Sequence, residues 1–174
     1  MGKTTRWIVP MVALLAVGCA PDDDADETAG AAPAAEAPPP PPAAVPAITV
    51  EVKGEGTGSA VVGQALVTPA ADGFEFAVNL NGVPAGAHAW HIHQGTCGEK
   101  DTPVVVPLSG EPSKPGLTSD LTPDANGAVT AAVQVPAGMV TVEQLKAGGY
   151  SLHVHEKTGA DHGPTIACAD LKGV

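Results

Sequence analysis

Hydrophobic and polar residues alternate along most of the chain after residue 47. Ile48, Val50 and Val52 are apolar, whereas the residues between them are polar. A period of two is typical of β-strands that have one buried face and one exposed face. We predict six further strands, over 60–67, 74–80, 87–93, 128–135, 150–155 and 165–171. One segment, 142–146, instead has the pattern of a single helical turn.

Turn residues separate the predicted strands. Asn81-Gly82 and Asn126-Gly127 are turn dipeptides, and the second is well suited to a tight hairpin. Residues 95–123 form a long irregular segment with five prolines, and such a segment is usually functional or tied down. The chain holds 21 glycines and 18 prolines among its 174 residues, which excludes a helical bundle. The sequence therefore predicts an all-β fold, either a sandwich or a small barrel.

The N-terminal residues have the features of an export signal. Lys3 and Arg6 precede an apolar run of ten residues, which is too short to span a bilayer but fits a signal-peptide core. The following Leu-Ala-Val-Gly-Cys resembles the bacterial lipoprotein box, in which the cysteine, here Cys19, is acylated. We therefore expect residues 1–19 to be a lipoprotein signal peptide. The alternative is an ordinary cleaved signal with an incidental cysteine.

Residues 20–47 differ in composition from the rest of the chain. They combine an acidic run at 22–27 with a block of five prolines at 38–42, which predicts a disordered tether rich in Pro, Ala and Asp. Residues 48–174 then form the folded domain. We expect the protein in the bacterial cell envelope, held by its lipid at the periplasmic or extracellular face of a membrane. The net charge of −11 disfavours nucleic acid as a partner.

Five of the six histidines fall within two predicted strands. Side chains two residues apart on a strand share a face, so His91 and His93 project together, as do His153 and His155. If the two strands are neighbours, four imidazoles converge. Imidazole clusters suit copper, zinc, iron or nickel, and copper is favoured among them by affinity. Chance surface histidines or a hydrogen-bonded pair are the alternative.

The remaining histidines and cysteines have separate interpretations. His88 has the opposite parity to His91, which predicts a buried structural ring bonded to the backbone. His162 lies in the predicted loop 158–164 and is a ligand, a lid residue or neither. If Cys19 carries lipid, Cys97 and Cys168 remain as an even pair in an oxidising compartment, which predicts a disulfide. Two free buried thiols are the alternative.

The order of these motifs resembles the copper/zinc superoxide dismutases, in particular their bacterial branch. The resemblance rests on HAWHIH at 88–93, Cys97, HVHE at 153–156 and IAC at 166–168, with LNGVPAG at 80–86 ahead of them. It implies a Greek-key β-barrel or sandwich of seven to eight strands, with copper bound outside one sheet. It also implies a disulfide between the Cys97 loop and the last strand. His91, His93 and His155 match three ligands of the catalytic copper centre, and His88 matches a structural histidine.

The chain departs from that family at the zinc site. No histidine lies between Cys97 and Tyr150, where the bridging histidine and two zinc ligands belong, and Asp120 alone remains at a zinc-ligand position. Thr165 replaces the arginine that holds superoxide in the family. We therefore expect one copper ion and no zinc, with His153 as the fourth copper ligand. His162 and Asp120 are further candidates.

Three functions are compatible with these residues. The first is a copper-only superoxide dismutase, converting superoxide to oxygen and hydrogen peroxide. Lys100 and Lys157 lie near the histidine motifs in sequence, where they would partly offset the acidic charge that repels this anion. The second is a non-catalytic copper module for storage, delivery or resistance, whose partner is a copper donor or acceptor. The third is a metal-free structural domain. The oligomeric state is not predicted.

Overall fold

The structure is a computed structural model that describes residues 46–55, 60–110 and 115–173. The predicted signal peptide, Cys19 and nearly all of the predicted tether lie outside the described residues. The strands are β1 (Ile48–Gly54), β2 (Val62–Ala70), β3 (Gly73–Asn81), β4 (Trp90–Gln94), β5 (Val104–Val106), β6 (Val129–Pro136), β7 (Tyr150–His155) and β8 (Thr165–Asp170). The helix is α1 (Val142–Ala147).

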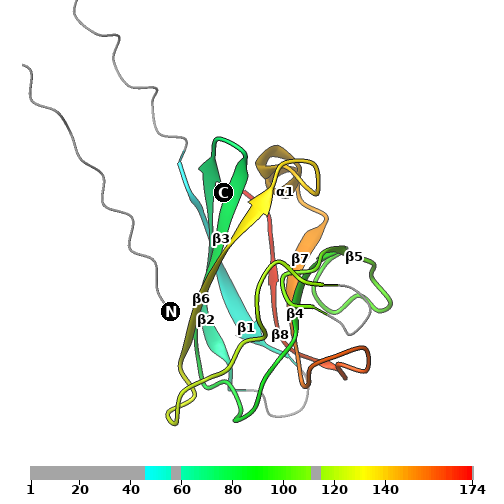
Figure 1. Ribbon diagram of the computed structural model, residues 1–174. Coiled ribbons are helices and arrows are strands. Elements are labelled where there is room, and N and C mark those ends of the chain that lie inside the picture. Colours follow the sequence, from blue (N-terminus) through cyan, green and yellow to red (C-terminus); the bar gives the residue numbers. More distant parts are fainter. Residues whose placement is uncertain (1–45, 56–59, 111–114, 174) are drawn as a thin grey trace, which may run out of the picture. The chain divides into compact units, whose positions relative to one another are not determined.

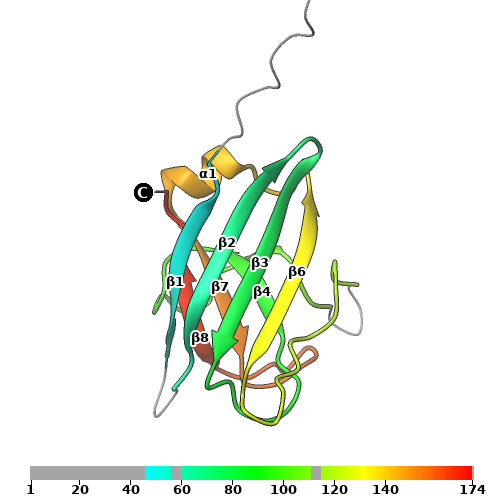
Figure 2. The same ribbon diagram turned by 90° about the vertical axis from the view of Figure 1, so that its left-hand side faces the viewer.

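All strand pairs are antiparallel and form one sheet in the order β5-β4-β7-β8-β1-β2-β3-β6. The sheet folds over so that β1, β2, β3 and β6 make one layer, with β4, β7 and β8 behind them (Figures 1 and 2). β3 pairs with β6, and β4 pairs with β7, across intervening segments, as in a Greek key. The predicted all-β Greek-key fold is confirmed.

The first layer follows the predicted period of two. In β3 the buried residues are Phe74, Phe76, Val78 and Leu80, and those between them are more exposed. A two-residue turn joins β2 to β3, so nine residues of each strand pair in register. The alternation places one apolar face against the second layer, where the Phe76 and Trp90 ring centroids lie 6.1 Å apart.

Strands β4 and β7 of the second layer are covered on both faces. The side chains of Trp90 and Ile92 are fully buried in the core, as are those of Leu152 and Val154. The residues between them are also buried, although four of these are histidines. Loops outside the sheet therefore cover the outer face of this layer, and this is where the site is formed.

The predicted irregular segment 95–123 is tied down at several points. It contains one strand that the sequence did not predict, the three-residue β5, which pairs with β4. Leu121 forms a β-bridge with His88, and the Thr118 amide donates to the Leu108 carbonyl at 2.8 Å. Asn126-Gly127 forms a turn, closed by a 3.0 Å bond from the Gly127 amide to the Asp124 carbonyl. It does not join two strands as a hairpin, because the residues before it form the Leu121 bridge instead.

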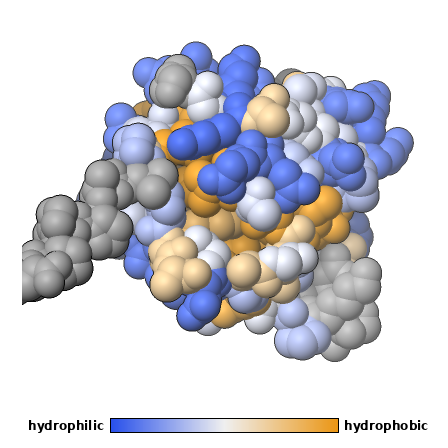
Figure 3. All heavy atoms as spheres, turned by 90° about the horizontal axis from the view of Figure 1, so that it is seen from above, coloured by the Kyte–Doolittle hydropathy of each residue, from blue (hydrophilic) through white to orange (hydrophobic). Residues whose placement is uncertain are grey.

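The short helix α1 begins at a capping box. The Thr141 hydroxyl accepts from the Gln144 amide, and the Gln144 side chain accepts in turn from the Thr141 amide. Within the described ranges, no helix is long and apolar enough to span a bilayer. Figure 3 views the end of the domain that holds α1 and shows apolar residues reaching the surface among polar ones.

Candidate metal centre

The register of β4 against β7 brings the two histidine pairs together. His91 lies directly opposite His153, and His93 lies opposite Ser151. The His155 amide donates to the Ala89 carbonyl at 2.8 Å, which continues the pairing of β7 with the β4 side. On the other side, the pairing of β7 with β8 shifts between Val154 and His155. The condition for convergence, that the two histidine-bearing strands are neighbours, is therefore met.

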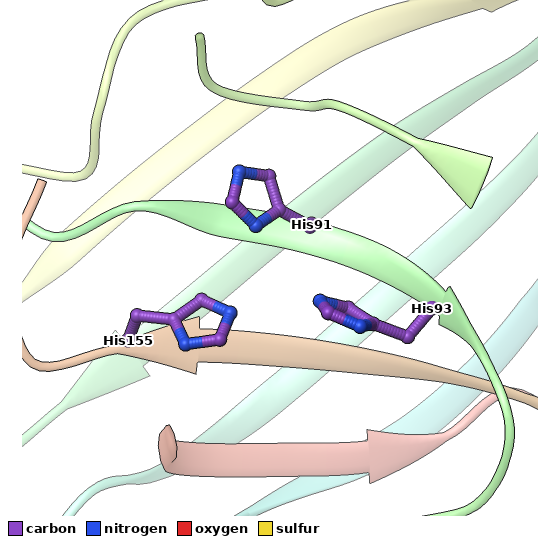
Figure 4. A group of neighbouring side chains, drawn as sticks. All are labelled: His91, His93 and His155. Carbon is purple, nitrogen blue, oxygen red and sulfur yellow. The ribbon is translucent and has the colours of Figure 1, made fainter. Parts of the chain in front are cut away.

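Three of these histidines form a compact group, which we call the three-ring group. One ring nitrogen from each of His91, His93 and His155 lies within 4.8 Å of the others. The ring centroids are 5.8 Å apart for His91 and His93, 5.3 Å for His91 and His155, and 5.6 Å for His93 and His155. Figure 4 shows His93 and His155 pointing toward each other from neighbouring strands, with His91 beside them. All three side chains are buried.

Each ring in this group has one nitrogen without a partner. Among the described residues, the buried side-chain atoms that lack a hydrogen bond are His91 Nδ1, His93 Nε2, His155 Nε2 and Asp120 Oδ1. Buried polar atoms without a partner are rare in folded proteins and each requires a physical explanation. Three unpartnered nitrogens that meet at one place could hold a metal ion, because each can direct a lone pair at it.

Backbone carbonyls orient two of the rings. His93 Nδ1 lies 2.8 Å from the Thr102 carbonyl oxygen, and His155 Nδ1 lies 3.3 Å from that of Gly163. A carbonyl only accepts, so Nδ1 carries the proton and Nε2 keeps its lone pair. Neither Thr102 nor Gly163 was singled out from the sequence, because main-chain acceptors are present at every residue and leave no signal in composition.

The electrostatics of the group keep its rings neutral. Burial, and after it the charge of His162, lowers the pKa of His91 to about 4 and that of His155 to about 3. Burial also lowers the pKa of His93, against an opposing contribution from the Thr102 backbone. At pH 7 these imidazoles are therefore unprotonated, which is the form that binds a metal.

His153 does not join the three-ring group, in contrast to its predicted role as a fourth ligand. Its Nε2 lies 2.9 Å from Ser151 Oγ, and its Nδ1 lies 3.0 Å from Thr165 Oγ1. Both ring nitrogens are therefore engaged by hydroxyl groups. The ring stacks on His93, with the centroids 4.4 Å apart and 26° between the planes. In this position His153 supports the orientation of His93.

The two further candidates differ in their position. The ring of His162, which is half-buried, lies 3.9 Å from the His155 ring and 5.4 Å from the His91 ring, centroid to centroid. Asp120 has one buried, unpartnered carboxylate oxygen. Neither residue belongs to the three-ring group as the structure stands.

His88 has the structural position predicted for it. Its Nδ1 lies 2.9 Å from the His155 carbonyl oxygen, and its Nε2 lies 2.9 Å from the Pro84 carbonyl oxygen. Its ring is buried and holds the backbone at the end of β7, next to the three-ring group.

The predicted disulfide is confirmed. Cys97 and Cys168 are bonded, with 5.8 Å between their Cα atoms, and the bond closes a span of 71 residues. The Cys97 amide also donates to Asp170 Oδ1 at 2.8 Å. These contacts fix the start of the irregular segment to β8, close to the Thr102 carbonyl that orients His93.

An open pocket of about 530 Å³ leads to the histidines. His93, His153, His155 and His162 line it, together with Glu55, Glu99, Lys100 and Asp101. Three carboxylates and one ammonium group give this lining a negative charge. Lys157, the other predicted offsetting cation, is not part of the lining and lies 4.0 Å from Glu156 in an exposed ion pair.

The comparisons with known proteins place the chain in a family. The model of the CHRD domain matches residues 41–162, which include all six histidines. The chain belongs to the CHRD domain family. The match ends before β8 and Cys168. The family shown is therefore the CHRD domain family, and not the superoxide dismutase family that the order of the motifs resembles.

No protein of curated function matches the chain. Among solved structures, it is similar to the Cu/Zn superoxide dismutase from Brucella abortus. The two share 23% sequence identity, and the superposition covers 73% of this chain and 100% of that chain, with a TM-score of 0.49.

Proposed function

We propose that this CHRD domain binds one copper ion through His91, His93 and His155. The observation that carries the proposal is the convergence of three buried ring nitrogens that have no hydrogen-bond partner. Their donor set is imidazole alone, because the cysteines within the described residues form a disulfide. Nitrogen donors suit copper and zinc alike, and copper(II) binds such sites more tightly in the general affinity order of divalent metals.

The test is competition between copper and zinc for the purified chain. With both metals at one equivalent, we expect about one copper and little zinc per chain by elemental analysis. His91→Gln and His155→Gln should lose bound copper, whereas Thr130→Ala, at an exposed position of β6, should bind as the wild type does. Equal uptake by the wild type and both histidine variants would refute the proposed site.

We further propose that the chain is exported and held at a membrane by a lipid on Cys19. An exported compartment is consistent with the Cys97–Cys168 disulfide, because disulfides persist in oxidising environments. Cys19→Ser should move the protein from the membrane fraction to the soluble fraction of its host and remove the mass of the acyl groups. If the wild type itself carries no acyl mass, the anchor is refuted.

A second candidate function is the dismutation of superoxide. The observation that favours it is the open pocket, which gives small molecules a route to His93 and His155. Bound copper would supply a one-electron redox couple, and the overall reaction turns two superoxide ions and two protons into oxygen and hydrogen peroxide. The same pocket makes the encounter slow, since Glu55, Glu99 and Asp101 repel an anion and Lys100 offsets one charge.

Charge variants test this second function. Glu99→Gln should raise the dismutation rate measured per bound copper, and Lys100→Gln should lower it, because each changes the potential at the pocket by one charge. Glu143→Gln, at an exposed position of α1, is the matched control and should leave the rate unchanged. If the copper-loaded wild type shows no dismutation above free-metal background, the chain binds copper without this activity, for storage or delivery.

A further inference from the structure

The three-ring group leaves one position of a four-nitrogen copper(II) site to be filled. His162 is the nearest further imidazole. It lies on the loop that follows β7, and its ring centroid is 3.9 Å from that of His155 and 5.4 Å from that of His91. It also lines the pocket that leads to the group. Any role of His162 as a ligand rests on the proposed copper site.

The backbone of this loop is firmly held. The Lys157 amide donates to the His162 carbonyl at 2.9 Å, and the Lys157 carbonyl accepts from the Ala89 amide at 2.9 Å. The Glu156 amide donates to the Pro164 carbonyl at 2.9 Å. These bonds hold the backbone of His162 near Ala89, next to the start of β4.

The ring of His162 is weakly held by comparison. Its Nδ1 lies 3.3 Å from the Gly159 carbonyl oxygen, which is as long as the bond between His155 and Gly163 and longer than both bonds of His153. A proton on Nδ1 leaves the lone pair on Nε2, as in His155. His153, in contrast, has both nitrogens bound to hydroxyls at about 3 Å and is stacked on His93. To recruit Nε2 of His153, a metal would have to displace the Ser151 hydroxyl at 2.9 Å, whereas turning the ring of His162 loses only a contact of 3.3 Å.

Asp120 is the remaining candidate. It has one unpartnered carboxylate oxygen. However, Asp120 does not line the pocket that leads to the three-ring group, and its oxygen is not one of the three ligand atoms that lie close together. We infer that His162 is the fourth nitrogen ligand of copper(II), and that its side chain turns toward the three-ring group when copper binds. His162 thereby closes the site from the pocket side.

The number of histidine nitrogens bound to copper(II) tests the inference. Pulsed electron paramagnetic resonance on the wild-type chain with ¹⁵N-labelled histidine should count four equatorial imidazoles. His162→Ala should reduce the count to three and raise the Kd for copper(II) by about 100-fold, at the upper end of the cost of losing a supporting partner of a metal ligand. Asp161→Ala, at the adjacent exposed position, is the control and should keep four imidazoles.

A second measurement needs no variant. Diethyl pyrocarbonate modifies exposed histidines, so half-buried His162 should react in the metal-free wild type and be protected when copper(II) is bound. Mass spectrometry of the digested chain locates the modification. Equal modification of His162 with and without copper, or four imidazoles retained in His162→Ala, would overturn the inference. Failure of the wild type to bind copper at all would instead refute the proposed function.

Discussion

The two layers of this domain bury their residues in different ways. In β3 every second side chain is buried and its neighbours are more exposed, so one face carries the packing. In β4 and β7 both faces are covered, with tryptophan and aliphatic residues inside and histidines outside. Burial alone therefore does not mark a functional residue. What distinguishes the outer face of β4 and β7 is that three buried nitrogens have no partner.

The largest expected effect on stability comes from removing the disulfide that joins the loop after β4 to β8. Replacing Cys97 and Cys168 together by serine should lower the free energy of unfolding by about 4 kcal/mol, because the bond closes a span of 71 residues. Urea denaturation measures this change. The variant should also bind copper more weakly, since Thr102 orients His93 from the segment that the disulfide holds. Unchanged copper affinity would show that the covering loops do not organise the site.

A variant of Ile92 in β4 measures how much the inner face contributes to stability. Ile92→Ala should lower the free energy of unfolding by about 3 kcal/mol in the metal-free chain, because the fully buried side chain leaves a cavity. The outer-face variant His155→Leu should cost only about 1 kcal/mol in the same denaturation measurement, because it removes one nitrogen that has no partner and one long bond to the Gly163 carbonyl. A loss as large as that of Ile92→Ala would contradict the distinction between the two faces.

The buried histidines on the outer face of β4 and β7 should also make the stability of the metal-free chain sensitive to acid. Histidine in the unfolded chain has a pKa near 6.5, whereas burial lowers the pKa of His91 to about 4 and of His155 to about 3 in the folded chain. Above about pH 7.5 both states are almost fully unprotonated, and stability hardly depends on these rings. As the pH falls from about 6.5 to 4, the unfolded chain binds more protons, and the free energy of unfolding falls by up to about 1.4 kcal/mol per pH unit for each ring.

Denaturation of the metal-free chain between pH 4 and pH 8 checks this slope. His155→Leu should reduce it, because one of the rings that protonates only on unfolding is gone. A slope in this variant equal to that of the wild type would mean that other groups cause the acid sensitivity.

The smallest expected effect on stability comes from removing the hydrogen bond between Thr165 and His153. Thr165→Val removes the hydroxyl that bonds His153 Nδ1 and should cost about 1 kcal/mol in urea denaturation. Because His153 stacks on His93, the electron paramagnetic resonance spectrum of the copper(II) form should also shift. An unchanged spectrum would show that the stacked ring does not influence the proposed metal site.

Much of this arrangement can be predicted from the sequence. The period of two predicts the strands, and the parity of His88, His91 and His93 separates the structural ring from the pair on the outer face. The two cysteines that remain once Cys19 is assigned to the lipid predict the disulfide. These features depend on local geometry, which a strand imposes regardless of what surrounds it.

The choice among the remaining polar candidates could not be predicted from the sequence. Parity places His153 on the same face as His155, but its nitrogens are taken by Ser151 on its own strand and by Thr165 on β8. The approach of His162 depends on a loop conformation in which Gly159 and Gly163 have positive φ angles, and loops show no periodicity. Likewise, β5 is too short for a recognisable pattern, and its pairing with β4 defines it.

The most direct test of the copper site compares the free energy of unfolding with and without copper. A ligand that binds only the folded chain raises this free energy, by about 2.7 kcal/mol when free copper is 100-fold above its Kd. We predict this gain for the wild type and none for His91→Leu under the same conditions. No gain in the wild type, or an equal gain in His91→Leu, would contradict a copper site formed by the three-ring group.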